Sequence, residues 1–84
     1  MNENLFKALG NVTRVKILAC LGDSSKNVTG LISNCDLSQS AVSQHLMYLR
    51  KAGLIKCERK GREQIYTVVD PRLSEICREL LYNF

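Results

Sequence analysis

The chain has 84 residues, of which 45% are hydrophobic and 24% charged, and its formal net charge at pH 7 is +4. This length suits a single domain, residues 1–84, and the composition is too apolar for a disordered chain. No apolar run approaches the ~20 residues of a membrane-spanning helix, and no basic-then-apolar leader opens the chain. We therefore expect a small cytoplasmic protein without a membrane partner.

The first part of the chain has apolar residues at helical spacing, and glycines interrupt them. A short helical face ends before Gly10 and consists of Leu5, Phe6 and Leu9. Asn11 is a suitable N-cap for a second helix that ends at Gly22. Its predicted inward residues are Val12, Val15, Leu18, Ala19 and Leu21.

A polar loop over residues 23–26 separates this helix from a third, short helix that begins near Val28. Residues 35–37 are too few for another element, so they indicate a tight turn. Ser38 is then a favourable N-cap for a fourth helix that runs to about Ala52. A short helix, a brief turn and a longer helix are typical of a helix-turn-helix.

Apolar residues of the fourth helix recur at i, i+4 and i+7, and these are Val42, Leu46 and Leu49. This spacing predicts one buried stripe, and Gly53 ends the helix. The period then changes. Residues 54–60 alternate like a half-buried strand, Lys60-Gly61-Arg62 forms a basic turn, and residues 64–69 are rich in β-branched and aromatic side chains.

Asp70 and Pro71 are suited to open a last helix, along which lie Ile76, Leu80 and Leu81. The complete pattern predicts a mainly α fold with a β-hairpin wing, in the order α-α-α-α-β-β-α. This is a winged helix-turn-helix.

The excess positive charge is confined to one segment. Between Ser38 and Arg62 there are six basic residues and one acidic residue, whereas the rest of the chain has six basic and seven acidic ones. Such a segment favours binding to the phosphates of double-stranded DNA. The plain alternative is a solvated charged surface.

The uncharged, hydrogen-bonding residues at the start of the fourth helix are candidates for reading base edges in the major groove. The complete set of predicted DNA-binding residues is Ser38, Gln39, Ser40, Ser43, Gln44, His45, Arg50, Lys60 and Arg62. An ordinary polar helix face is the alternative for the uncharged members. His45 could equally pack at the helix edge.

The two ends of the chain are more apolar than so small a core can absorb, which is typical of an interface. We expect a homodimer through the N- and C-terminal helices, with two recognition helices facing a palindromic site.

The positions of the cysteines and the histidine give little support for catalysis or metal binding. The four cysteines, at positions 20, 35, 57 and 77, contain no C-x-x-C pair, and His45 is the only histidine. We therefore expect no catalytic residue, no metal site and no cofactor, and we expect each cysteine to be a small buried hydrophobe rather than part of a disulfide. A thiol enzyme or metal carrier is the least favoured alternative. A winged helix that contacts another protein is the stronger one.

Two stretches resemble the ArsR/SmtB family of winged-helix repressors: "LFKALGNVTRVKILACL" and "LSQSAVSQHLMYLRKAGLIKCERKGREQIYTV". The first is similar to that family's "ALADPTRLRIL" segment, and together they cover most of the chain. The resemblance implies a dimeric repressor that an inducer releases from its operator. It places Gln39, Ser40, Ser43 and Gln44 at the base-reading positions and Lys60, Gly61 and Arg62 in the wing.

The resemblance also concerns inducer sites. Where metal-thiolate members have a C-x-C pair, this chain has Asn27 and Thr29, and Asp70 lacks the histidine two residues later that zinc members have. A third group of members senses persulfides through cysteines on the second and last helices. Cys20 and Cys77 fall on these helices, out of the family's register, so a redox role for the pair competes with simple burial.

Overall fold

Helices and one hairpin follow each other in the predicted order. The computed structural model describes residues 3–22, 24–35 and 37–84. Its elements are α1 Glu3–Leu9, α2 Val12–Leu21, α3 Val28–Cys35, α4 Gln39–Lys51, β1 Ile55–Lys60, β2 Glu63–Val68 and α5 Pro71–Tyr82. The predicted winged helix-turn-helix is therefore confirmed. Asp23 of the predicted loop and Asp36 of the predicted turn lie outside the described residues.

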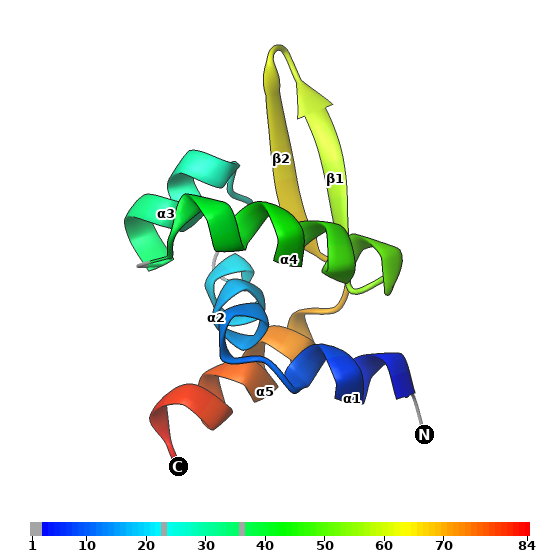
Figure 1. Ribbon diagram of the computed structural model, residues 1–84, viewed down its shortest axis with the longest axis vertical. Helices are drawn as coiled ribbons and strands as arrows, with labels where there is room; N and C mark the ends of the chain where they lie inside the picture. Colours follow the sequence, from blue (N-terminus) through cyan, green and yellow to red (C-terminus); the bar gives the residue numbers. More distant parts are fainter. Residues whose placement is uncertain (1–2, 23, 36) are drawn as a thin grey trace.

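The hairpin projects from one end of the molecule, which measures 36 × 24 × 22 Å (Figure 1). Helices α3 and α4 lie at the base of the hairpin, α2 occupies the centre, and α1 and α5 lie at the end opposite the hairpin tip. The core surrounds α2, where Ile17 and Leu18 are fully buried, and it includes Leu31, Val42, Leu46, Leu49, Val68 and Leu73 from the other elements. The predicted stripe of α4 is thus the buried one.

Helices α2 and α5 approach each other closely at Gly22. A Cβ atom on Gly22 would lie 2.5 Å from the Cβ of Ser74, so only glycine fits there without movement. Ser74 is buried, and its hydroxyl donates a hydrogen bond of 2.7 Å to the backbone carbonyl of Leu18. This bond satisfies a carbonyl near the C-terminus of α2, where helical partners run out.

Gly53 makes the change from α4 to β1. Its φ of +77° lies in the left-handed region. The amide of Gly53 donates to the carbonyl of Arg50, and the amide of Leu54 donates to the carbonyl of Leu49. This pair of bonds is the Schellman motif that ends many helices. It sets the direction in which the hairpin leaves α4.

The hairpin is antiparallel, with Ile55 opposite Val68 at its base and Lys60 opposite Glu63 at its tip. Two residues connect the strands, and the first, Gly61, has the positive φ that short hairpin turns favour. The segment between α2 and α3 pairs with β2 as well, because Lys26 and Tyr66 exchange two backbone hydrogen bonds of 3.1 and 2.8 Å.

Some predicted details are wrong. Val12 is 62% exposed, so it does not belong to the inward face of α2. On α5 the buried residues are Leu73, Ser74 and Cys77, whereas Ile76 and Leu80 are 49% and 46% exposed, which agrees with the predicted excess of apolar residues at the ends of the chain. Asn11 and Asp70 cap their helices as predicted, but the side chain of Ser38 makes no capping bond. No helix in the described ranges is long and apolar enough to cross a membrane.

Candidate nucleic-acid interface

The start of α4 presents a polar surface. Because Val42, Leu46 and Leu49 point into the core, the side chains between them point outward. Gln39, Ser40, Ser43 and Gln44 are all exposed, and none of them makes a side-chain hydrogen bond within the described residues. Their donors and acceptors are therefore available to a ligand. Ser38 is exposed at the N-cap, and His45 is half-buried on the same helix.

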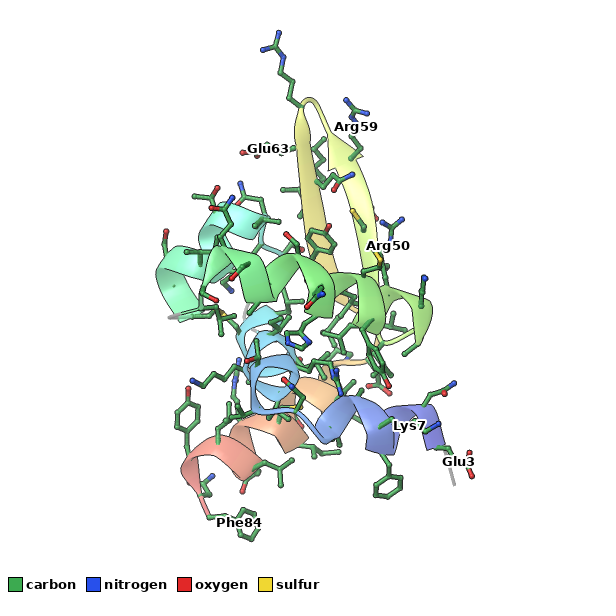
Figure 2. The ribbon with its side chains drawn as sticks, in the orientation of Figure 1. Glu3, Lys7, Arg50, Arg59, Glu63 and Phe84 are labelled. Carbon is green, nitrogen blue, oxygen red and sulfur yellow. A yellow bond between two sulfur atoms is a disulfide. The ribbon has the colours of Figure 1, made fainter. Side chains whose placement is uncertain are left out.

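The outward face of α4 continues toward the hairpin. A hollow of about 470 Å³ lies between them, lined by Ser43, Met47, Arg50, Lys51, Gln64 and Tyr66. Met47 is 61% exposed, and Arg50 and Lys51 place two cations beside it. Figure 2 labels Arg50 between the helix and the base of the hairpin. Met47 and Gln64 are not among the predicted DNA-binding residues, although Met47 lies one helical turn after Ser43.

The tip of the hairpin concentrates positive charge. Arg59, Lys60 and Arg62 are exposed there, as the sequence predicts for Lys60 and Arg62. Arg59 and Glu63 stand near the tip in Figure 2. The Nε of Arg59 donates to the carbonyl of Gly61 at 3.3 Å, which directs the guanidinium toward the turn.

A second hollow, of about 390 Å³, separates the hairpin from the N-terminus of α3, and it is lined by Asn27, Val28, Thr29, Arg59, Arg62, Glu63 and Gln64. Across it the side-chain amide of Asn27 donates to the carboxylate of Glu63 at 2.9 Å. The hairpin is thus tied to the helix-turn-helix at this point. Gln64 lines both this hollow and the hollow beside α4, so the two hollows meet at β2.

The cysteines differ from the prediction. Cys20 of α2 is joined by a disulfide to Cys35 of α3, with a Cα–Cα distance of 6.2 Å. The expectation that no cysteine is part of a disulfide is therefore wrong. Cys20 is bonded to Cys35 and not to Cys77, and the redox role of Cys20 and Cys77 stays a prediction. The bond forms because α2 and α3 pack side by side, which the spacing of cysteines along the chain does not reveal.

Cys77 and Cys57 are free. Cys77 is fully buried, as expected, and burial raises the pKa of its thiol to about 11. It is therefore a protonated thiol at neutral pH, and the thiol is a poor nucleophile compared with the thiolate. Cys57 is half-buried on β1. Within the described residues, no group of three or more His, Cys, Asp or Glu side chains could hold a metal ion.

A helix-turn-helix whose second helix exposes polar side chains, next to a hairpin with a cationic tip, defines a winged helix-turn-helix of the DNA-binding class. The sequence comparisons give the family. The model of bacterial regulatory proteins of the ArsR family matches residues 11–56. This chain belongs to the ArsR family.

Relatives agree with this assignment along most of the chain. The transcriptional activator HlyU of Vibrio cholerae is 42% identical over 79 residues, which is 94% of this chain and 72% of that protein. The structure of Vibrio cholerae HlyU superimposes with a TM-score of 0.79 at 35% identity and covers 96% of this chain and 90% of that one. The transcriptional repressor PagR of Bacillus anthracis superimposes with a TM-score of 0.76 at 35% identity, over 90% and 87% of the two chains.

Proposed function

We propose that residues 1–84 act as one winged-helix unit in the cytoplasm, bind an operator in double-stranded DNA as a homodimer, and repress transcription. The observation that carries this proposal is the unpaired polar face of α4 beside a cationic hairpin. In this arrangement α4 enters the major groove, and the hairpin reaches the neighbouring backbone or groove.

The four exposed residues at the start of α4 are proposed to contact the base edges. A glutamine amide can pair with N6 and N7 of adenine through two hydrogen bonds, and a serine hydroxyl can donate or accept. Gln39 and Gln44 therefore carry most of the predicted discrimination, with Ser40 and Ser43 as additional contacts. Ser38 and His45 lie at the edge of this face and are proposed to contact the backbone.

Phosphate binding falls to Arg50, Lys60 and Arg62. Each phosphate that a cation neutralises releases a counterion and adds about 0.9 to the slope of log K against log salt. Lys60 and Arg62 are exposed and form no ion pair with a described acidic residue, so both cations are available to phosphates. Binding is expected to weaken steeply as salt rises.

The support for a homodimer is an exposed apolar surface at the end of the molecule opposite the hairpin tip. Large apolar side chains of α1 and α5 are exposed there: Phe6 at 55%, Ile76 at 49% and Leu80 at 46%, with Phe84 just beyond α5 at 95%. Figure 2 labels Phe84 at this end. A second copy covering this surface would bury these side chains and place two copies of α4 toward one DNA duplex.

The dimer is tested by light scattering at micromolar concentration. Leu80→Glu is expected to give a monomer, because it places a charge in the apolar surface. Val69→Glu is the matched control, since Val69 is 55% exposed but lies outside α1 and α5. A wild-type monomer, or equal masses for both variants, would contradict the dimer.

DNA binding is tested by fluorescence anisotropy with DNA from the region upstream of the gene and with a scrambled duplex. Gln44→Ala should lower the preference for the upstream DNA by about 1–3 kcal/mol. Asn83→Ala, an exposed amide far from α4, should leave it unchanged. Equal losses on both duplexes would contradict base reading by Gln44.

The wing is tested with Arg62→Gln. This variant should bind both duplexes more weakly and lower the salt slope by about 0.9 for each chain. Lys7→Gln on α1 has the same charge change away from the hairpin and should leave the slope as it is. An unchanged slope for Arg62→Gln would remove the hairpin tip from the interface.

Repression, as opposed to activation, needs its own test, because the relatives include both a transcriptional activator and a transcriptional repressor. A dimer bound near a promoter blocks polymerase by occupying the DNA. Transcription in vitro from the upstream DNA should therefore fall as protein is added. A rise in transcript would assign activation instead.

A further inference from the structure

The outward face of α4 carries a large apolar side chain among its polar ones. Met47 is 61% exposed, whereas the apolar residues Val42, Leu46 and Leu49 of the same helix are buried. A single exposed apolar residue is ordinary on a protein surface, so exposure alone assigns Met47 no role. Its position on the helix is the observation that points to a contact.

Met47 lies near the centre of the face that is proposed to contact base edges. At 3.6 residues a turn, it is about 20° from Ser40, about 40° from Ser43 and about 60° from Gln44 around the helix axis. Ser43 and Met47 also line the same hollow of about 470 Å³ beside the hairpin. A helical side chain points back toward the N-terminus of its helix, so Met47 leans toward the turn that contains Ser43 and Gln44.

The surroundings of Met47 suit the major groove of a DNA duplex. Arg50 and Lys51 follow it by about one helical turn, and both line the hollow with it. Cations beside an apolar side chain match a duplex, in which phosphates flank the base edges. The apolar group that bases present in the major groove is the C5-methyl of thymine, and apolar side chains make contact with it.

We propose that Met47 is a specificity-determining residue that contacts the C5-methyl group of a thymine in the operator. This inference rests on the proposed function, since it requires α4 to lie in the major groove. Met47 is three residues after Gln44, about 5 Å along the helix, and two base pairs span about 7 Å. The thymine therefore lies within about two base pairs of the base that Gln44 contacts.

The test uses a duplex that the wild-type protein selects from a pool of random sequences. Each thymine of this duplex is replaced in turn by deoxyuridine, which keeps the pairing with adenine and lacks only the methyl group. Burial of one methyl group corresponds to about a fourfold change in affinity. Replacement of the contacted thymine should therefore raise the Kd of the wild-type protein about fourfold in fluorescence anisotropy.

Variants of Met47 assign the effect to this side chain. Met47→Ala should bind the thymine and deoxyuridine duplexes equally, because alanine is too short to reach the methyl group, and Met47→Leu should keep part of the preference. Val69→Ala is the matched control, since it shortens a side chain that is 55% exposed on another element, and it should keep the wild-type ratio. Alanine and leucine both favour helices, so circular dichroism should show an unchanged fold for the Met47 variants.

Two results would overturn the role of Met47. The first is that no thymine can be found whose replacement weakens binding by the wild-type protein, and the second is that Met47→Ala keeps the wild-type ratio. The first comparison needs no variant, so it is decisive even where a substitution disturbs the fold. Both results leave the selected duplex, and with it the proposed DNA binding, in place. Failure to select any sequence would overturn the proposed function and the role of Met47 together.

Discussion

Arg14 of α2 connects three helices through one side chain. Its Nε donates to the carbonyl of Ala8 at 2.9 Å, and its Nη2 donates to the carbonyl of Lys7 at 2.8 Å. Its guanidinium carbon also lies 4.1 Å from the centre of the Tyr48 ring on α4. The two carbonyls belong to the last turn of α1, where helical partners become scarce; the Lys7 carbonyl also accepts from the amide of Gly10 at 3.2 Å. Arg14 therefore both caps α1 and stacks on Tyr48 of α4.

The cost of removing Arg14 can be worked from these contacts. A hydrogen bond to a charged group contributes about 1.5–3 kcal/mol when shielded, which applies to the part-buried bond to Ala8. The bond to Lys7 is exposed and adds little. A cation–π contact at a partly exposed site adds about 0.5–1 kcal/mol. Arg14→Ala should therefore lower the free energy of unfolding by about 2–4 kcal/mol, a large part of a small domain's stability.

Urea unfolding followed by circular dichroism checks this value at one fixed protein concentration. Arg14→Lys should keep part of the stability, because one ammonium group cannot serve both carbonyls and the ring. Tyr48→Leu and the double variant complete a cycle whose coupling energy should be about 0.5–1 kcal/mol. Arg72→Ala is the matched control, since Arg72 is exposed and pairs with Asp70. A loss for Arg14→Ala no larger than for Arg72→Ala would refute the reasoning, and zero coupling would refute the contact with Tyr48.

Three other outcomes are expected. Gly53→Ala should lower the unfolding free energy, measured in urea, by about 1–2 kcal/mol, because alanine disfavours a φ of +77° although no atom lies within 4 Å of the added Cβ. Gly53→Asn should lower it less. Equal stability of all three proteins would contradict this. Iodoacetamide at pH 8 should modify Cys57 in the folded protein well before Cys77, because burial holds the pKa of Cys77 near 11, and mass spectrometry would show the reverse order if this is wrong. Reduction of the Cys20–Cys35 disulfide should lower the unfolding free energy by about 3 kcal/mol, because the bond joins residues 15 positions apart and restricts the unfolded chain. Identical urea midpoints before and after reduction would contradict this.

The sequence was sufficient for the order of elements because each element has its own period. Val42, Leu46 and Leu49 repeat at helical spacing, and the alternation after Gly53 changes to that of a strand. The exposure of Gln39 and Gln44 follows directly from the same period, since the residues between buried positions of a helix point outward. These predictions depend only on the spacing of residues within one element, and the structure confirms them.

Tertiary contacts were beyond the sequence. Helix α5 carries apolar residues on two faces, and its packing buries Leu73, which the spacing of apolar residues did not single out. The disulfide between Cys20 and Cys35 depends on how two helices cross, and the bridge between Lys26 and Tyr66 depends on where a loop meets a strand. None of these contacts leaves a periodic pattern in the chain.

The backbone bridge between Lys26 and Tyr66 restricts movement of the hairpin. Strand β2 is joined to the α2–α3 segment at three levels: Lys26 with Tyr66, Ser25 with Thr67, and Asn27 with Glu63. Tilting the hairpin away from the helices would break these bonds, so they favour one distance between its tip and α4. A hairpin held in this way adapts its span to DNA only at the cost of these bonds. The duplex must supply the adjustment through its bend and groove width, and sequences that deform easily would be favoured at base pairs that no side chain touches.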